Sequence, residues 1–390
     1  MPSIHILHLI SGLGVGGAER TLQQVVCGLD PARFQSTVVS LGERGVLGDE
    51  LSAEGVPLRS LGMRPGHPAA LDIRRLTELL KELRPDLIQT WMYHADLLGL
   101  LAARRAGAPA IVWNVRGSGR TLRQWGISTA LVVRACAMLS AWPQAVVVNS
   151  EAGRAAHIRL GYRPRSWVLI PNGVDTNRFR PDPNARAQVR SALGISAETL
   201  VVGSVGRNHP VKRYAWILRA AAALRTHHPD LAVVLVGEGL ASDNRELADL
   251  GQSLGIVGRL HLIGPVSEVP RWLAAMDVFV SASASEGFPN AIAEAAACQV
   301  PCVVTDAGDS RAIVDQAGVV VGVDDPDGLA AGLQRLAALG AAGRGRLGAQ
   351  ARARVTQAYS REAMLHAYEE LYARIGSSLP GAASDSSPQA

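Results

Sequence analysis

The sequence predicts an α/β protein built from two Rossmann-like, doubly wound domains, each with a parallel sheet between layers of helices. Short apolar segments alternate with amphipathic helical segments along the chain, which is the pattern of such sheets. This pattern begins twice, each time with an apolar strand followed by a glycine-containing turn. The length of 390 residues also exceeds that of one typical domain. We therefore expect two domains that face each other across a cleft.

The expected strands form two series along the chain. They are residues 4–10, 35–42, 85–91, 110–115, 145–150 and 167–174, and then 200–206, 231–237, 260–264, 278–283, 301–306 and 318–322. The clearest helical segments are 71–83, 95–106, 212–226, 243–254, 267–275, 290–298, 309–316 and 326–339, and a longer helical pattern covers 345–375. Pro, Asn and Asp are dense near 171–184 and mark a boundary.

We therefore expect an N-terminal domain of residues 1–175 and a C-terminal domain of residues 176–359. A final helix at about 360–375 should pack back on the first domain. Residues 376–390 are rich in Ser, Ala, Pro and Gly and are expected to be disordered.

The composition excludes several classes of protein. Apolar residues make up 48% of the chain, which indicates a buried core. No apolar run reaches the roughly 18–20 residues that span a bilayer. The first residues, MPSIHILHLI, lack a basic region and are typical of a buried strand, not a signal peptide. The four cysteines lack metal-site spacing, so we expect no metal ion and a reducing, cytoplasmic environment.

Positive charge is concentrated in the first half. Residues 1–180 contain 21 Lys and Arg against 13 Asp and Glu, whereas residues 181–390 contain 18 against 21. This excess suits a phosphorylated glycan, a lipid phosphate or a membrane surface, although it could also be compositional only. No basic run is interleaved with aromatic residues, so nucleic acid is not an expected partner. Residues 120–142 mix Arg, Trp and apolar residues and could form either a membrane-surface helix or a core-facing helix.

The first glycine turn permits two interpretations. Residues 12–17 formally match the G-x-G-x-x-G fingerprint of NAD-dependent oxidoreductases, with Glu43 as the acidic residue after the second strand. Alternatively, Gly16 and Gly17 bring bare backbone against a diphosphate or a sugar. A purely structural turn is the third alternative.

Two cations follow the first strand of the second series. Arg207 offers a planar fork and Lys212 a point charge five residues later, an arrangement that can hold a diphosphate leaving group from two directions. Taken alone, they could equally be solvated loop cations. Their combination with the two carboxylates described next favours a binding site.

Glu286 and Glu294 flank a turn between a strand that ends near Ser281 and a helix that starts near Asn290. Helix starts carry unpaired N–H groups that bind phosphate or sugar oxygens. Carboxylates are strong acceptors for vicinal hydroxyl groups. A nucleotide-sugar contains both kinds of group, so this segment predicts a nucleotide-sugar site.

Each of these motifs follows a strand directly, and ligands of doubly wound sheets bind beyond the carboxyl ends of the strands. The motifs can therefore line one cleft. Asp325 and Asp327 match a metal-binding D-x-D pattern in spacing, but a role in capping the following helix is favoured.

Together these motifs resemble glycosyltransferase family 4, whose members are retaining enzymes with the GT-B fold. The glycine loop of the family is matched by Gly16–Glu19, and its linker by the VLIPNGVD sequence at 168–175. Its G-R-x4-K element is matched by Gly206 to Lys212, and its E-x7-E element by Glu286 to Glu294. The resemblance extends from about residue 4 to residue 375, and the ordered combination is specific.

The resemblance implies a role for each matched residue. Arg207 and Lys212 would neutralise the departing diphosphate, and Glu286 would bind hydroxyl groups of the transferred sugar beside its anomeric carbon. Glu294 would bind the ribose hydroxyl groups. Further contacts would come from Gly16 and Gly17 to the diphosphate, from the backbone of Gly287, Phe288 and Asn290 to sugar and phosphate, and from the regions of Glu238 and Val266 to the base.

The N-terminal half carries a variant of the family pattern. Arg116, in the sequence WNVRG, stands where many relatives have His and could bind a phosphate or an acidic sugar. His94 and Asp96, in the sequence YHAD, are candidates to contact the acceptor or the sugar, or they could be core and capping residues. This variant resembles bacterial enzymes of surface-polysaccharide assembly, which implies a polyprenol-linked acceptor.

The sequence thus predicts a cytoplasmic, retaining hexosyltransferase, peripheral on the inner face of the plasma membrane. It would transfer sugar from a UDP- or GDP-sugar to a glycan or lipid-linked glycan, without a cofactor. The alternatives are an NAD-dependent oxidoreductase, an isomerase or phosphorylase of the same fold, and a non-catalytic nucleotide-sugar binding module.

Overall fold

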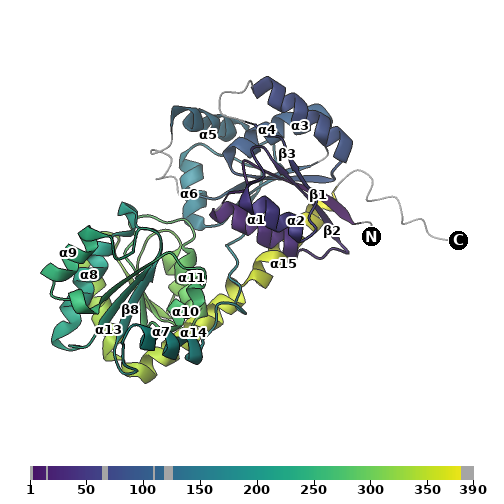
Figure 1. Ribbon diagram of the computed structural model, residues 1–390. Coiled ribbons are helices and arrows are strands. Elements are labelled where there is room, and N and C mark those ends of the chain that lie inside the picture. The colour runs from purple at the N-terminus through teal and green to yellow at the C-terminus, as the bar shows by residue number, and fades with distance from the viewer. Residues whose placement is uncertain (1–2, 15, 64–68, 109, 118–125, 379–390) are drawn as a thin grey trace. The chain divides into compact units, whose positions relative to one another are not determined.

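The computed structural model describes residues 3–14, 16–63, 69–108, 110–117 and 126–378, and it divides into two compact units (Figure 1). The N-terminal unit comprises the chain up to Gly173 together with the chain from Glu362 onward. The C-terminal unit comprises Val174–Arg361. Each unit has its own parallel sheet, which confirms the predicted fold class of two doubly wound α/β domains.

The sheet of the N-terminal unit has the order β3-β2-β1-β4-β5-β6-β7, and all of its strand pairs are parallel. Its elements are β1 Ile4–Ile10, α1 Gly17–Gly28, β2 Phe34–Ser40, α2 Gly45–Ala53, β3 Leu58–Ser60, α3 Ala69–Leu83, β4 Leu87–Trp91, α4 Tyr93–Ala106, β5 Ile111–Val115, α5 Ile127–Leu139, β6 Ala145–Val148, α6 Glu151–Arg159, β7 Trp167–Leu169 and, from the end of the chain, α15 Arg361–Gly376. The strand order reverses between β1 and β4, and doubly wound sheets bind ligands at this switch point.

The sheet of the C-terminal unit repeats this topology with the order β10-β9-β8-β11-β12-β13. Its elements are α7 Pro183–Ala192, β8 Val201–Val205, η2 Pro210–Lys212, α8 Tyr214–Ala223, η3 Leu224–Thr226, β9 Ala232–Val236, α9 Arg245–Ser253, η4 Val257–Arg259, β10 Leu260–Gly264, α10 Val269–Ala274, β11 Val278–Ser281, α11 Asn290–Ala297, β12 Cys302–Thr305, α12 Ser310–Val314, β13 Gly318–Val321, α13 Pro326–Ala338 and α14 Gly340–Ala358. Here the switch point lies between β8 and β11.

Helices cover both faces of each sheet, so the strands are buried on both sides, as their nearly continuous apolar sequences require (Figure 1). In the N-terminal unit, α1, α2 and α15 cover one face, and α3, α4 and α5 cover the other. In the C-terminal unit, α10, α11 and α14 cover one face, and α8, α9 and α13 cover the other. Each sheet therefore holds the loops at its carboxyl edge on a rigid base.

The helical pattern expected at 345–375 is divided between the two units: α14 belongs to the C-terminal unit and α15 to the N-terminal unit. The pattern is broken at Tyr359 and Ser360, where a short bridge pairs Ser360 with Val174, and α15 then packs into the N-terminal unit. Tyr368 on α15 accepts a hydrogen bond from Asn114 Nδ2 at 2.8 Å, and the fully buried Tyr372 lies against Phe34.

Other local features also differ from the expectations; for example, the strand expected at 167–174 ends at Leu169. The edge strand β3 was not predicted, because it has only three residues and none of them is buried. The predicted helix at 212–226 begins at Tyr214, because Lys212 ends a 3₁₀ turn and Arg213 adopts the left-handed conformation with φ of 52°. The expected tail falls largely outside the described residues. No helix in the described part of the chain combines the length and the apolar character needed to cross a membrane.

Candidate active site

The candidate site of the C-terminal unit lies at the switch point of its sheet. Lys212 follows β8 and Glu286 follows β11, which are the two central, neighbouring strands. Lys212 Nζ lies 2.6 Å from Glu286 Oε1, so the structure brings two of the predicted site residues into direct contact. Their side chains are 28% and 15% exposed, respectively, so a ligand can reach both.

Hydrogen bonds from neighbouring strands hold Glu286 in place. Ser283 Oγ donates to Glu286 Oε1 at 2.7 Å, and Thr305 Oγ1, at the end of β12, donates to the Ser283 carbonyl at 2.6 Å. The backbone N–H of Ala284 also donates to the Val211 carbonyl at 2.8 Å, which joins the loop of Glu286 to that of Lys212. The two charged groups are therefore positioned before any ligand binds.

The loop after β12 gives a second support. Gly308 has a φ of +60°, and a Cβ atom there would overlap the carbonyl oxygens of Glu286 and Gly287. The N–H of Asp309 donates to the Gly287 carbonyl at 3.0 Å. Only glycine combines this conformation with so close an approach.

Glu294 lies on α11 and is only partly exposed. Its carboxylate makes no hydrogen bond or ion pair with any residue that the structure describes. Burial raises its pKa to about 7, and the positive charge of Arg178 partly opposes this shift. When it is ionised, this carboxylate can accept hydrogen bonds from ligand hydroxyl groups through both of its oxygens.

The turn between Glu286 and α11 presents free backbone donors. Within the described parts of the chain, the N–H groups of Gly287 and Phe288 donate to no acceptor. The Phe288 ring is buried with its centroid 5.5 Å from that of Tyr359, which anchors the turn, and Asn290 is the exposed first residue of α11.

Three further predicted residues lie at the same edge without meeting the central pair. Arg207 is exposed in the loop after β8 and makes no hydrogen bond or ion pair among the described residues. Glu238 is exposed after β9, where its carbonyl accepts a hydrogen bond from Asn208 N–H at 2.7 Å. Val266 is half-buried after β10.

In the N-terminal unit, the glycine loop is open. Gly16 caps α1 and Gly17 is its first residue. A Cβ atom at Gly17 would touch no described atom, whereas one at Gly16 would overlap the Glu19 carboxylate, which folds back over it. The packing of the described residues therefore does not require glycine at position 17, which favours a contact with a ligand over a purely structural turn.

Arg116 follows β5 near this loop. Its Nη2 donates to Thr21 Oγ1 on α1 at 3.0 Å and also to Asn172 Oδ1, and its guanidinium lies over the Trp91 ring at 5.7 Å. Burial lowers the pKa of Arg116, yet a guanidinium stays charged at neutral pH. Its Nη1 atom is buried, and within the described residues no carboxylate forms an ion pair with the guanidinium.

His94 and Asp96 separate in the structure. His94 is exposed on the first turn of α4. Asp96 is fully buried and accepts a hydrogen bond from Thr90 Oγ1 at 2.5 Å, and burial raises its pKa well above the usual value. Asp96 therefore fills the core role that the sequence analysis left open, because a side chain without exposed surface cannot touch a substrate.

Sequence reasoning missed the residues that support the charged pair: Ser283, Thr305, Gly308 and Tyr214. The buried Tyr214 lies beside the loop after β8, since a Cβ atom at Gly206 would lie 3.0 Å from its hydroxyl oxygen. The serines of SASASEG were the available signal for Ser283, but their spacing alone did not say which one faces Glu286.

No group of three or more His, Cys, Asp or Glu side chains in the described ranges is arranged to hold a metal ion. Asp325 Oδ1 accepts from the Gly328 N–H at 2.8 Å and caps α13, which confirms the capping interpretation of the D-x-D pattern.

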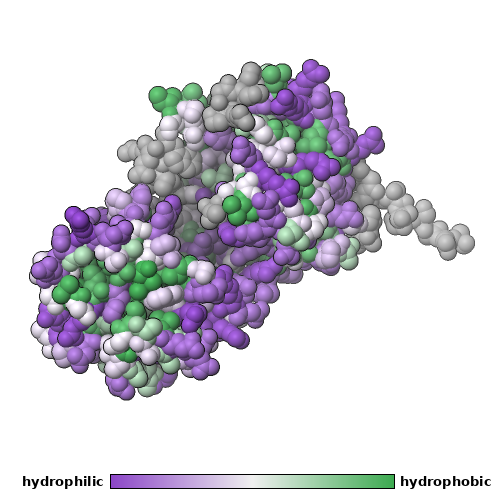
Figure 2. Space-filling view, in the orientation of Figure 1, coloured by the Kyte–Doolittle hydropathy of each residue, from purple (hydrophilic) through white to green (hydrophobic). Residues whose placement is uncertain are grey.

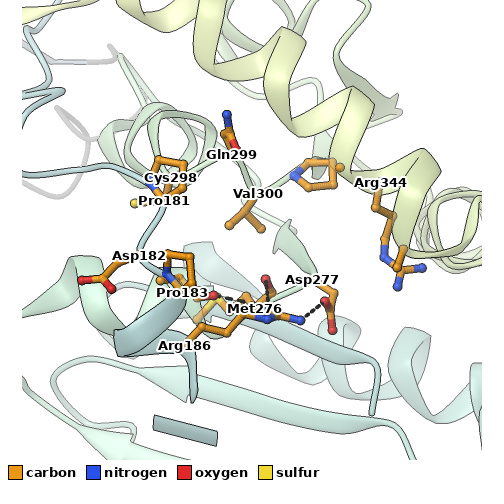
Figure 3. A pocket seen from close by; sticks show the side chains of 14 residues that line it. Pro181, Asp182, Pro183, Arg186, Met276, Asp277, Cys298, Gln299, Val300 and Arg344 are labelled. Carbon is orange, nitrogen blue, oxygen red and sulfur yellow. Dashed lines mark hydrogen bonds and ion pairs between the residues drawn. The ribbon is translucent and has the colours of Figure 1, made fainter. Parts of the chain in front are cut away.

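The C-terminal unit also has a surface pocket of about 320 Å³ away from these motifs (Figure 3). Asp277 and Pro301 line it just before β11 and β12, so it lies at the amino edge of the sheet. There the Arg186 Nη2 atom lies 2.6 Å from Asp277 Oδ1, and Arg190 pairs with the other carboxylate oxygen at 2.7 Å. Since ligands of doubly wound sheets bind at the carboxyl edge, this pocket is not the candidate active site.

Two family models match the chain. Residues 15–178 match "Glycosyltransferase Family 4", and residues 199–338 match "Glycosyl transferases group 1". These matches favour the transferase interpretation of the glycine loop over the oxidoreductase one.

Curated relatives and a solved structure agree with these models. The GDP-mannose-dependent alpha-(1-6)-phosphatidylinositol monomannoside mannosyltransferase of Mycolicibacterium smegmatis is 31% identical over 280 residues, which are 66% of this chain and 71% of the relative. The UDP-Gal:alpha-D-GlcNAc-diphosphoundecaprenol alpha-1,3-galactosyltransferase of Escherichia coli is 29% identical over 269 residues, or 67% and 68% of the two chains. The crystal structure of Anabaena Alr3699/HepE in complex with UDP matches with a TM-score of 0.83 at 22% identity, over 95% of this chain and all of that chain, and this likeness shows the GT-B fold. On the matched models and relatives, the chain belongs to glycosyltransferase family 4, and it is a hexosyltransferase-type enzyme.

Proposed function

We propose that this glycosyltransferase transfers a sugar from a UDP- or GDP-sugar to a lipid-linked glycan, with retention of configuration at the anomeric carbon. The observation that carries the proposal is the contact between Lys212 and Glu286 at the β8–β11 switch point. A cation for the diphosphate and a carboxylate for the sugar are held there within one hydrogen bond of each other. Glu294 lies on the adjacent helix α11, has no hydrogen-bond or ion-pair partner among the described residues, and is the acceptor for the ribose hydroxyl groups.

In the proposed reaction, the bond between the anomeric carbon and the diphosphate oxygen breaks while the acceptor hydroxyl attacks from the same face. The acceptor proton passes to the departing phosphate oxygen. Lys212 and Arg207 stabilise the negative charge that develops on the diphosphate, which is where preorganised cations lower the barrier most. Glu286 holds the sugar hydroxyl groups beside the anomeric carbon.

The N-terminal unit would contribute to phosphate binding. The open backbone at Gly17 and the positive charge of the Arg116 guanidinium are suited to an anionic group of the nucleotide-sugar or of the acceptor. His94, exposed on α4, remains a candidate contact to the acceptor.

The lipid-linked acceptor is inferred from the relatives, one of which is named for a diphosphoundecaprenol substrate and another for a phosphatidylinositol mannoside. Such acceptors lie in membranes, so we place the chain at the cytoplasmic face of the plasma membrane, in polysaccharide assembly. Because cationic side chains are available for the diphosphate, we also propose that transfer needs no divalent cation.

The first experiment is thermal unfolding of the full chain with UDP, GDP, their sugar conjugates and NAD. A ligand at 100 times its dissociation constant adds about 2.7 kcal/mol of stability. We expect a shift with one nucleoside diphosphate and not with NAD, and we expect E294A to lose it. A shift with NAD alone would contradict the proposal.

The second experiment measures nucleoside diphosphate release from the sugar conjugate that binds. Release should require an added acceptor, persist in EDTA and yield a product whose anomeric configuration, determined by NMR, matches that of the nucleotide-sugar. Consumption without an acceptor would indicate an isomerase, and a requirement for inorganic phosphate would indicate a phosphorylase. An inverted product would refute retention.

A further inference from the structure

One surface of the N-terminal unit exposes more apolar side chain than folding explains. On α5, Ile127, Leu131 and Met138 are 84%, 61% and 79% exposed. Their spacing of four and seven residues places them on one stripe of the helix, which also carries the exposed Arg134. The opposite side of α5 is buried through small or short side chains, so the large residues point away from the core.

The neighbouring helix continues this surface. Trp142, just beyond α5, is partly exposed and stacks on the Arg104 guanidinium of α4 at 3.5 Å. Between the two helices lies an open pocket of about 320 Å³ lined by Leu100, Leu101, Arg104, Arg105, Leu139 and Trp142. We call the exposed stripe of α5 together with this pocket the α4–α5 face. Figure 2 shows exposed hydrophobic residues at the edge of the molecule where Figure 1 places α5.

The exposed charged side chains on the two helices of this face are arginines, and Glu78 of the neighbouring α3 lines a separate pocket together with Arg105. Residues 97–150, which include α5 and nearly all of α4, contain no Asp or Glu. Arg104, Arg105 and Arg134 are exposed on the two helices. An apolar stripe flanked by arginine side chains is the composition of helices that lie in the interface of an anionic bilayer, where the apolar side chains enter the acyl region and the cations meet phosphate groups.

A second copy of the chain fits this face less well. A symmetric contact would bring the same arginines of both copies together, and neither α4 nor α5 offers an exposed carboxylate to pair with them. An anionic lipid surface supplies both the apolar layer and the negative charge.

We propose that the α4–α5 face docks the enzyme on the surface of an anionic phospholipid bilayer. This face would supply the contacts to the bilayer in a chain whose described part has no membrane-crossing helix. The docking proposal does not depend on whether the proposed acceptor is correct.

The test is co-sedimentation of the full chain with vesicles of phosphatidylcholine alone and with 30 mol% phosphatidylglycerol. We expect binding to the anionic vesicles that weakens as NaCl is raised. The variant L131S/M138S should bind at least about tenfold more weakly, because two apolar side chains no longer enter the bilayer. The control V46S/V257S removes two valines of similar exposure elsewhere and should bind as the wild type does.

A second pair of variants isolates the charge. R105Q/R134Q should lose about fivefold in binding for each arginine at low salt, whereas R245Q/R335Q, on exposed arginines of the C-terminal unit, should lose little. The thermal shift with a nucleoside diphosphate should be the same in all variants, which shows that they fold. No nucleotide-sugar or acceptor is present in the vesicle assay, so its outcome is independent of the proposed reaction.

Three results would overturn the proposal. The first is that the wild-type protein does not bind vesicles with phosphatidylglycerol. The second is that L131S/M138S binds these vesicles as tightly as V46S/V257S does. The third is that the wild-type protein is a dimer in solution and that L131S/M138S is a monomer. The last would assign the face to a second copy of the chain.

Discussion

Glu294 should destabilise the free enzyme while it contributes to ligand binding. Burial raises its pKa from 4.5 to about 7, so the folded protein holds a proton that the unfolded chain has already released. Stability that is present below pH 4.5 is therefore lost as the pH rises toward 7, and the loss is complete above 7. At about 1.4 kcal/mol per pKa unit, the ionised carboxylate costs the fold up to about 3.5 kcal/mol at pH 8.5.

The variant E294Q removes this titration and tests the reasoning. At pH 8.5 it should raise the melting temperature of the C-terminal unit by several degrees, since about 1 kcal/mol corresponds to roughly 2–4 °C for a domain of this size. The gain should shrink toward pH 5. The same variant should bind the nucleotide about tenfold or more weakly, because a charged acceptor for hydroxyl groups is worth about 1.5–3 kcal/mol per hydrogen bond.

Differential scanning calorimetry across pH and calorimetric titration with UDP or GDP measure the two effects. E246Q, on the exposed first turn of α9, is the matched control and should change neither quantity. A melting temperature for E294Q at pH 8.5 equal to or below that of the wild type would refute the burial argument. Unchanged nucleotide affinity would refute the assigned role.

Three further predictions concern the C-terminal unit. K212A should lower kcat about 100- to 1000-fold in a transfer assay, as removal of one preorganised charge-stabilising group does elsewhere. R335A, which removes an exposed cation from α13, should not, and equal activity of both variants would exclude Lys212 from the reaction. G308A should lower the unfolding free energy by about 1–3 kcal/mol and should also lower activity, because its Cβ would overlap the Glu286 and Gly287 carbonyls. The control G194A also places alanine at a positive φ, +66°, but in open space, so it should lose only the part of the unfolding free energy that the backbone conformation costs. D277A should destabilise the unit by about 3–5 kcal/mol in denaturant unfolding, because Arg186 and Arg190 lose their shared carboxylate. A change below about 1 kcal/mol would mean that the backbone carbonyls that these arginines also contact are enough to stabilise their buried charges.

The short apolar runs of the sequence were sufficient to predict the two sheets, because strands buried on both faces consist almost entirely of residues such as Val, Ile and Leu. They failed where local patterns carry little signal. The three-residue β3 has no buried side chain, and the 3₁₀ turn at Lys212 depends on the left-handed backbone of Arg213, which no hydrophobic pattern encodes.

The candidate site was predictable in its charged residues but not in their supports. Lys212 and Glu286 could be predicted because each is a charged residue that follows an apolar strand. Their contact could not be predicted, because they are 74 positions apart in the sequence and are brought together by the strand order. Asp96 shows the converse limit. It has the chemistry of a ligand contact, but in the structure it is buried and accepts a hydrogen bond from Thr90 in the core.

The two units share one sheet topology, but the glycines in the loops after their strands differ in how closely other atoms surround them. In the C-terminal unit, Cβ atoms at Gly237 and Gly308 would strike the backbone of Gly206 and Gly287, so the loops after β8, β9, β11 and β12 are packed against one another. In the N-terminal unit, a Cβ atom at Gly45 would overlap the Leu13 carbonyl, but Cβ atoms at Gly12, Gly14 and Gly17 of the glycine loop itself would meet no described atom. The loops of the C-terminal unit are therefore preorganised by their own domain, as electrostatic stabilisation of a leaving group requires. Among the described residues, no packing contact explains Gly12, Gly14 and Gly17 of the N-terminal glycine loop, and close approach of a ligand to bare backbone would explain them.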